Sequence, residues 1–252
     1  MSDHDILQLR GITKRFGSTP VLERLDFSLR RGERRGLIGP NGAGKTTLVN
    51  IITGKHRADA GTILYRAENI TTMPAFRRNR AGIGRSFQIL SLFAGMTVAE
   101  NLRHAVLRHL GLHVHALRRT SHIAGVAQRV EHAASLLGIE QALDERVDTL
   151  PYGMQRRLDI ALVLVQGPEL VILDEPAAGL SAAETRELVD VLRTAIGERT
   201  LILVEHDMDV VYALSERITV LDYGRVLAEG TPAQINADPE VRRAYLGTAT
   251  ES

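Results

Sequence analysis

The chain has no cysteine and no tryptophan, and only 4% of its 252 residues are aromatic. The absence of cysteine excludes disulfides and thiolate metal sites, which is compatible with a reducing compartment. An excess of charge of one sign is also missing, because 31 lysines and arginines balance 30 acids and leave a formal net charge of +1. This balance gives no support for a nucleic-acid partner that is held by bulk charge.

Long apolar runs are missing as well. No stretch approaches the roughly 18 apolar residues that a membrane-spanning helix needs. The first ten residues include Asp3 and Asp5 and lack a long apolar core, so we expect no secretory signal there. With 44% hydrophobic residues, the chain is long enough for one sizeable core, or for a core with a subdomain.

One stretch, residues 39 to 47, carries the strongest chemical signal. It fits the phosphate-binding pattern G-x-x-x-x-G-K-[ST] without a mismatch. Its residues are Gly39, Pro40, Asn41, Gly42, Ala43, Gly44, Lys45, Thr46 and Thr47. A short apolar run precedes it and a helical pattern follows it, which is the strand–loop–helix context that this motif needs. A chance match in a chain of this length is on the order of one in a hundred.

The chemistry of this stretch favours an anion. Its glycines let successive backbone N–H groups point inward, and the loop ends at a helix N-terminus, whose dipole attracts negative charge. We expect Lys45 to reach the β- and γ-phosphates of a nucleotide and the Thr46 hydroxyl to bind Mg²⁺.

The hydrophobic pattern around the loop predicts an α/β fold. Alternating segments at 6–16 and 21–29 precede the loop and a short one at 62–65 follows it, which indicates an antiparallel β-subdomain. Continuous apolar runs at 170–173 and 200–204 are typical of parallel strands covered on both faces. Capping boxes start helices at Thr97, before these two runs, and at Ser181, between them.

We predict a single domain over residues 1–252, with a parallel sheet in its core. The core and its β-subdomain cover residues 1–88 and 167–252, and an α-helical subdomain covers about residues 89–166. A continuous strand is expected over residues 83–88. The basic run at residues 77–80 is interpreted as a solvated face.

Two carboxylates follow the predicted strand at 170–173. Asp174 is expected to hold Mg²⁺ through a water, and Glu175 to polarise a water against the γ-phosphate. The alternative is a strand that ends in two solvated acids.

Three further side chains are candidates, each with a structural alternative. Gln88 follows a predicted core strand, and its amide could bind Mg²⁺ and report the γ-phosphate; the alternative is a surface glutamine. His206 follows another strand and could orient the attacking water; the alternative is a capping or core histidine. Phe16 could stack on adenine, or could be a core aromatic. The segment between residues 104 and 122 contains several histidines but no carboxylate, so a metal site is not the favoured interpretation there.

Taken in order, the phosphate loop, Gln88, residues 150–155, the Asp174–Glu175 pair and His206 resemble an ATP-binding-cassette (ABC) ATPase along essentially the whole chain. The resemblance implies a P-loop NTPase fold that uses ATP and Mg²⁺. It also implies a second ABC ATPase subunit, because the signature at residues 150–154 would contact the ATP of the other subunit. Tyr152 and Gly153 are then the residues that bind nucleotide in trans.

A finer resemblance is to the ATP-binding subunits of branched-chain amino-acid importers. It rests on residues 86–88, 92–93, 96–102, 152–153, 175–180, 205–208, 230–232 and 244–247. It implies transmembrane permease subunits, an extracytoplasmic solute-binding protein as an indirect partner, and a peripheral location on the cytoplasmic face of the cell membrane. The open alternatives are an exporter ATPase of lipid or lipopolysaccharide type and a non-transport ABC ATPase.

The signature departs from the family pattern at two positions. Pro151 stands where the family has Ser, or Ala in this branch, and Met154 stands where Gln is usual. Pro151 offers neither a hydroxyl nor an N–H to a γ-phosphate, although a proline at a helix start is compatible with folding. The second subunit is expected to form a hetero- or a homodimer with this chain, and the altered signature favours a heterodimer with two unequal ATP sites.

Overall fold

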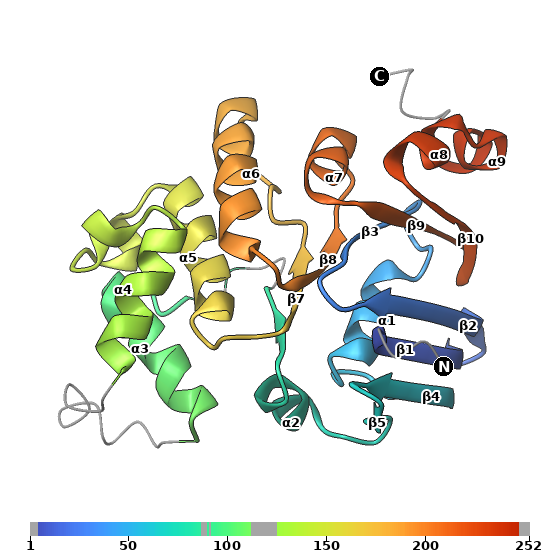
Figure 1. Cartoon of the computed structure of the whole chain (residues 1–252), viewed down its shortest axis with the longest axis horizontal. Coiled ribbons are helices and arrows are strands. Elements are labelled where there is room, and N and C mark those ends of the chain that lie inside the picture. The colour runs from blue at the N-terminus through green and yellow to red at the C-terminus, as the bar shows by residue number, and fades with distance from the viewer. Residues whose placement is uncertain (1–4, 87–89, 91, 112–124, 247–252) are drawn as a thin grey trace. The chain divides into compact units, whose positions relative to one another are not determined.

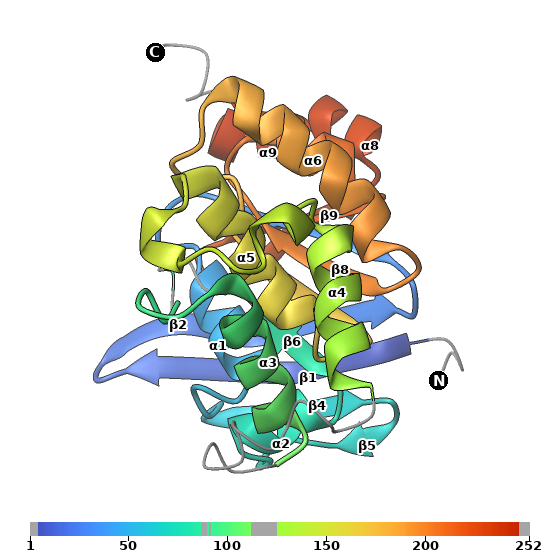
Figure 2. The same ribbon diagram turned by 90° about the vertical axis from the view of Figure 1, so that its left-hand side faces the viewer.

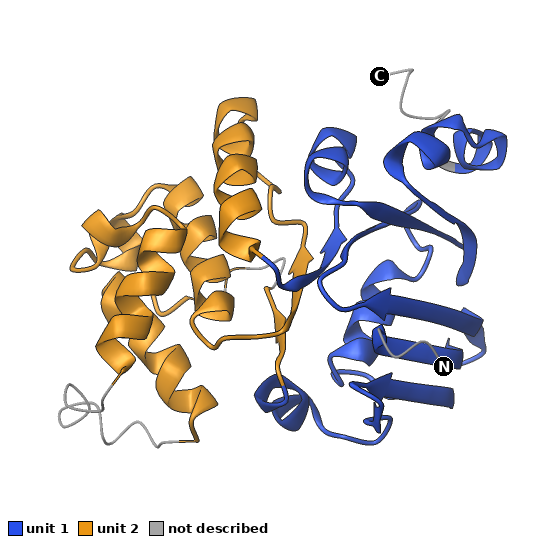
Figure 3. Cartoon of the chain, viewed as in Figure 1, with its two compact units in different colours: residues 1–81, 198–252 blue, residues 82–197 orange. Residues whose placement is uncertain are grey.

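The computed structural model describes residues 5–86, 90, 92–111 and 125–246, and it has the predicted α/β fold (Figure 1). The chain forms two compact units, shown in Figure 3. Unit 1 comprises residues 1–81 and 198–252, and unit 2 comprises residues 82–197. The subdomain boundaries expected from the sequence divide the chain differently and stay a prediction. None of the helices in the described ranges is long and apolar enough to cross a membrane.

Unit 1 contains the antiparallel sheet that the sequence predicted. Its strand order is β2-β1-β4-β5. The strands are β1 (Asp5–Phe16), β2 (Thr19–Arg30), β4 (Ala60–Tyr65) and β5 (Glu68–Asn69). Both β2 and β4 run antiparallel to β1. Alternate side chains of the long strands are buried, because successive residues of a strand point to opposite faces.

Unit 1 also contains three parallel strands, and the middle one leads into the phosphate loop. The strand β3 (Arg34–Ile38) lies between β8 (Thr200–Val204) and β9 (Arg217–Asp222) and runs parallel to both. The last strand, β10 (Arg225–Gly230), is antiparallel to β9. The helices of this unit are α1 (Lys45–Ile52), α2 (Ala75–Arg80), α7 (Met208–Leu214), α8 (Pro232–Ala237) and α9 (Pro239–Val241).

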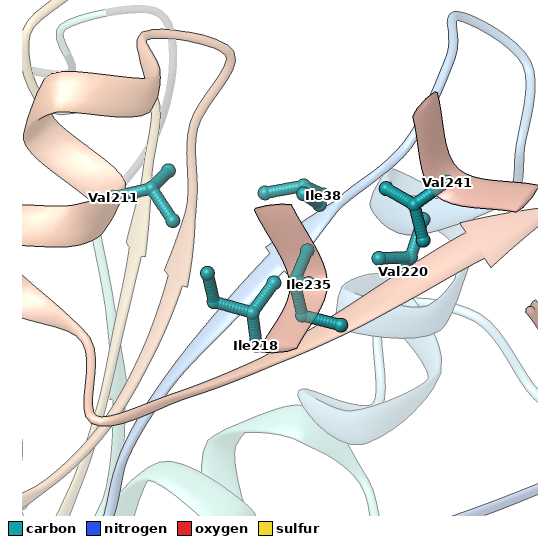
Figure 4. Close-up of a cluster of buried hydrophobic side chains, with 6 residues drawn as sticks. All are labelled: Ile38, Val211, Ile218, Val220, Ile235 and Val241. Carbon is teal, nitrogen blue, oxygen red and sulfur yellow. The ribbon is translucent and has the colours of Figure 1, made fainter. Parts of the chain in front are cut away.

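A buried apolar cluster anchors the end of β3, directly before the phosphate loop (Figure 4). Ile38, the last residue of β3, belongs to this cluster and is fully buried. The other members come from α7, β9, α8 and α9, and are Val211, Ile218, Val220, Ile235 and Val241. The C-terminal helices α8 and α9 therefore contribute to the core that holds Gly39 at the start of the loop.

In its described residues, unit 2 is mainly helical and has one pair of strands. β6 (Ile83–Arg85) runs parallel to β7 (Leu170–Asp174). Its four long helices are α3 (Val98–His109), α4 (Val126–Leu136), α5 (Tyr152–Leu164) and α6 (Ala182–Ile196). Figure 2 shows α3, α4 and α5 side by side, in agreement with their contacts.

The helix starts in unit 2 confirm the capping boxes, and one strand is shorter than predicted. The Thr97 and Ser181 side chains accept from the backbone N–H of Glu100 and Glu184, and the two glutamates reach back to the cap residues. The predicted strand over 83–88 is wrong in length, because β6 ends at Arg85. After it, the Ser86 hydroxyl accepts a backbone hydrogen bond from Asp174.

The interpretation of the basic run at 77–80 as a solvated face is wrong for Arg78, which is only 2% exposed. Its guanidinium donates to the carbonyls of Ile51 (2.7 Å) and Ile52 (2.9 Å) at the end of α1. It also donates to the carbonyls of Met73 and Thr71. Burial lowers the pKa of Arg78 to about 10. The reason is that α2 has an inner face, and carbonyls at a helix C-terminus attract a cation.

Replacing this side chain tests its role. We expect Arg78→Met to lower the free energy of unfolding by about 3 kcal/mol, because buried carbonyls lose their donor. The matched control is Arg80→Met on the exposed face of the same helix, expected within about 0.5 kcal/mol of the parent. Chemical denaturation followed by circular dichroism measures both, and equal effects would contradict the assigned role.

Candidate nucleotide-binding site

The phosphate loop is fixed by two glycines that have no room for a side chain. Gly39 has φ +146°, and a Cβ added there would lie 2.1 Å from the carbonyl oxygen of Leu221. Gly44 has φ +102°, and its Cβ would lie 2.8 Å from the Leu22 side chain. Both ends of the loop therefore touch neighbouring strands so closely that only glycine fits.

Lys45 lies inside this loop. Its Nζ donates to the carbonyl oxygens of Gly39 (2.6 Å) and Pro40 (3.0 Å). α1 begins at Lys45, and its N-cap, Gly44, offers no side chain to the first N–H groups. A lysine ammonium and a helix N-terminus that face one loop suit a phosphate, which accepts charge-assisted hydrogen bonds. Thr46 is exposed on the first turn, where its hydroxyl is available to a ligand.

Phe16 is not a core residue. Its side chain is 47% exposed, which excludes the core-aromatic alternative. The ring makes an edge contact with His56, with 5.4 Å between the centroids, and Lys14 Nζ lies 5.4 Å from its centre. Stacking on adenine stays a prediction.

His206 follows β8 and is also exposed, with 70% of its side chain accessible. The core alternative is therefore wrong. The capping alternative is wrong too, because Asp207 caps α7 and accepts from the N–H groups of Asp209 and Val210. Glu205, which is 1% exposed, accepts the backbone N–H of His206 at 3.0 Å. This buried carboxylate fixes the backbone that carries the exposed imidazole.

Asp174 ends β7 in unit 2 and is only 4% exposed, so it is not a solvated acid. Its Oδ2 accepts from Nη2 of Arg85 at 2.6 Å. We did not anticipate Arg85 from the sequence. The signal that could have found it is its position: it ends β6, which runs parallel to β7, so the two residues come to the same edge.

Glu175 follows directly and has an uncommon backbone, with φ +50°. A residue with a Cβ atom is sterically strained in this left-handed region. The Glu175 carbonyl accepts from Nη2 of Arg156, and the carbonyl of Pro176 accepts from Nε of the same arginine at 3.0 Å. Arg156, on α5, was also not singled out in the sequence.

The signature segment forms the start of α5. Pro151 is the N-cap of α5, one position before the first helical residue, and its carbonyl accepts from the backbone N–H of Met154 at 3.0 Å. Tyr152 is 44% exposed and its hydroxyl donates to the carbonyl of Ala178 at 3.2 Å. A Cβ on Gly153 would lie 3.1 Å from Oε1 of Glu184. The binding of another subunit's nucleotide by Tyr152 and Gly153 stays a prediction.

The candidate residues divide between the two units. The phosphate loop, Phe16 and His206 belong to unit 1, whereas Asp174, Glu175 and the signature belong to unit 2. Gln88 lies outside the described residues. No group of three or more His, Cys, Asp or Glu side chains that could hold a metal occurs in the described ranges, and part of the histidine-rich stretch at 104–122 falls outside them.

The close approach at Gly39 gives a testable prediction. Gly39→Ala is expected to lower the free energy of unfolding by about 3 kcal/mol, because its Cβ cannot avoid the Leu221 carbonyl without a backbone shift. Gly11→Ala is the matched control, since Gly11 also has positive φ, +59°, but open space around it. We expect it to cost about 1 kcal/mol. Equal losses in urea unfolding would show that the contact at Gly39 does not constrain the loop.

The buried ion pair between Arg85 and Asp174 gives a second testable prediction. Arg85→Met leaves the Asp174 carboxylate buried without this partner, and is expected to cost about 3–5 kcal/mol. Arg146→Met breaks a pair of the same length, 2.6 Å, in which both side chains are largely exposed, and should change stability little. Thermal and urea unfolding measure the stability of both variants. A similar loss of stability in the two would contradict a special role for burial of the Arg85 pair.

Known proteins resemble this chain in sequence and in fold. A family profile described as ABC transporter matches residues 22–178, and one described as branched-chain amino acid ATP-binding cassette transporter matches residues 225–251. The high-affinity branched-chain amino acid transport ATP-binding protein LivG of Escherichia coli is 40% identical over 251 residues, covering 97% of this chain and 98% of its own length. The corresponding protein BraF of Pseudomonas aeruginosa is 38% identical with the same coverage.

Solved structures agree with these matches. A nucleotide-free ATP-binding cassette from an ABC transporter is 27% identical and superposes with a TM-score of 0.79, covering 96% of this chain and 98% of its own. A cassette of an ABC transporter in its ADP conformation is 27% identical, with a TM-score of 0.81 and coverage of 96% and 99%.

Proposed function

This chain belongs to the ABC transporter family of ATP-binding proteins, and from that premise we propose that it is the ATP-hydrolysing subunit of an importer of branched-chain or related amino acids. The observation that carries the proposal is the 40% identity to LivG over 97% of the chain. The match of residues 225–251 to the branched-chain profile supports the same branch of the family. Neither finding favours the exporter or non-transport alternatives.

In this proposal, the loop from Gly39 to Thr47 binds the phosphates of ATP. Lys45, which donates to the Gly39 and Pro40 carbonyls, exchanges these neutral acceptors for charged phosphate oxygens. Phe16 stacks on the adenine. Mg²⁺, when bound, neutralises phosphate charge; we assign Thr46, Gln88 and Asp174 to it, with Asp174 acting through a water. Arg85 holds Oδ2 of Asp174, so Oδ1 is the oxygen assigned to that water.

Glu175 and His206 supply the chemistry of hydrolysis in this proposal. Glu175 accepts a proton from the attacking water, and His206 donates a hydrogen bond to the γ-phosphate and orients that water. The exposure of the His206 side chain, 70%, leaves it accessible to a ligand. Gln88 reports the presence of the γ-phosphate to the segment that follows it.

The proposed cycle needs other chains. A second ABC ATPase subunit closes against this one on ATP, and the turn at Tyr152 and Gly153 contacts the nucleotide of that partner. ATP drives closure because it binds the closed pair more tightly than the open one. Pro151 weakens the contribution to the partner's site, which favours a heterodimer. Permease subunits carry the solute, an extracytoplasmic binding protein delivers it, and this chain acts on the cytoplasmic face of the membrane.

The catalytic assignment predicts that Glu175→Gln lowers ATP turnover of the assembled complex by on the order of a thousandfold, because the general base is lost. The affinity for ATP should change little, since the phosphate loop is intact. Phosphate release and nucleotide binding are measured on the same preparation. Glu131→Gln, on the exposed face of α4, is the control with unchanged turnover. If Glu175→Gln leaves turnover intact and the equivalent change in the partner abolishes it, this chain does not hold the working site.

The transport assignment is tested by uptake. Complex in lipid vesicles, with ATP on the side of the ATPase subunits and binding protein on the other, is expected to accumulate radiolabelled leucine. Uptake should stop when the complex carries Glu175→Gln. ATP-dependent export of lipid, or hydrolysis with no uptake of any branched-chain or related amino acid, would contradict the importer assignment.

A further inference from the structure

A buried arginine joins the signature helix to the backbone of the proposed general base. Arg156 is 1% exposed and lies on α5, one turn after Tyr152. Its guanidinium donates to two successive carbonyls, from Nη2 to Glu175 and from Nε to Pro176. The planar fork of an arginine can hold two acceptors in a fixed geometry, which a lysine cannot do. Arg156 therefore constrains the peptide groups on the C-terminal side of Glu175.

The backbone at that point needs such a constraint. Glu175 has φ +50°, a conformation that residues with a side chain rarely adopt. Such conformations persist where the surrounding structure over-determines them, and they cluster at functional sites. The direction of the Glu175 side chain depends on this φ, because the Cα–Cβ bond turns with the backbone. Loss of the two hydrogen bonds from Arg156 would release the backbone and reorient the carboxylate.

Two further contacts tie the first turn of α5 to the segment after β7. The Tyr152 hydroxyl donates to the carbonyl of Ala178 at 3.2 Å. The Tyr152 ring also lies beside Gly179, which has φ +80° and whose added Cβ would be 3.1 Å from Cε1 of the ring. The start of the signature helix thus touches this loop at its beginning, through Arg156, and at its end, through Tyr152.

We propose that Arg156, on the signature helix α5, is a positioning residue for Glu175. The proposal rests on the proposed function, because it takes Glu175 as the general base. Arg156 holds the Glu175 and Pro176 carbonyls, and it thereby fixes the direction in which the Glu175 carboxylate leaves the backbone.

A double-mutant cycle tests this inference on the assembled complex. In every assembly the partner ATPase has its own general base replaced by glutamine, so that the measured turnover belongs to this chain. The four forms carry the parent sequence, Arg156→Gln, Glu175→Gln and both changes. We expect Arg156→Gln to lower kcat about thirtyfold, within the range for a misplaced catalytic group, with KM for ATP changed less than twofold. In the Glu175→Gln background, Arg156→Gln should lower the residual single-turnover rate less than twofold. The reason is that the effects of substitutions at residues that act as a unit are not additive.

Two variants separate positioning from a general structural role. Arg157→Gln removes the neighbouring arginine, which pairs with Glu187 at 2.9 Å, and should leave kcat and KM unchanged. Arg156→Lys keeps the charge and one donor direction, and is expected to retain about a third of the parent kcat. If size-exclusion chromatography shows that Arg156→Gln does not assemble into the complex, Arg156→Lys takes its place in the double-mutant cycle.

The outcomes distinguish this inference from the proposed function. A loss from Arg156→Gln that multiplies with the loss from Glu175→Gln, or that appears in KM and not in kcat, overturns the positioning role. A full kcat in both Arg156 variants, with Glu175→Gln inactive, overturns it as well but leaves the proposed function standing. If Glu175→Gln itself has no effect on turnover, the catalytic assignment and the inference fall together.

Discussion

The close approach between the Gly39 backbone and the Leu221 carbonyl is the constraint on which the phosphate loop depends. A side chain at residue 39 would overlap that carbonyl, with its Cβ 2.1 Å from the oxygen, so the chain can leave β3 for the loop only through a glycine. The buried cluster that includes Ile38 fixes the end of β3, and both C-terminal helices, α8 and α9, contribute side chains to it (Figure 4). Within the loop, Lys45 Nζ donates to the Gly39 and Pro40 carbonyls, which we propose that phosphate oxygens replace. The buried cluster therefore ends directly before the residues to which we assign phosphate binding.

The local part of this structure was predictable because its signals are short-range. The phosphate pattern, the capping boxes at Thr97 and Ser181, and the alternation in β1 and β2 all lie within a few residues of the feature they specify. The contacts of three arginines were harder to predict. Arg78 and Arg156 donate to backbone carbonyls, which every residue has, so the sequence carries no mark of these contacts. Arg85 binds Asp174, which lies 89 residues away in the chain, and it is the parallel pairing of β6 with β7 that brings the two together. The length of β6 was missed because the hydrophobic pattern continues after its pairing with β7 stops.

The buried arginines give unit 2 a specific internal organisation. Arg85 compensates the charge of Asp174 at the end of β7, and Arg156 holds the next two carbonyls from α5. Asp174 and Glu175 are adjacent in sequence but are fixed by different elements, β6 and α5. The departure at Pro151 leaves these contacts intact, since the proline caps α5 and the helix continues through Arg156. The replacement at Pro151 therefore leaves in place the arginine contacts that hold Asp174 and Glu175.

We propose that the loop from Gly39 to Thr47 holds the phosphates of ATP and that a second chain completes the site. A structure of the assembled complex that carries Glu175→Gln and is bound to Mg²⁺ and ATP would test both parts at once. Lys45 Nζ is then expected to have left the Gly39 and Pro40 carbonyls and to lie within hydrogen-bond distance of the β- and γ-phosphates, with another ATPase subunit's signature turn facing the γ-phosphate. Lys45 still bound to the loop carbonyls, with the phosphates held elsewhere or enclosed by this chain alone, would contradict it.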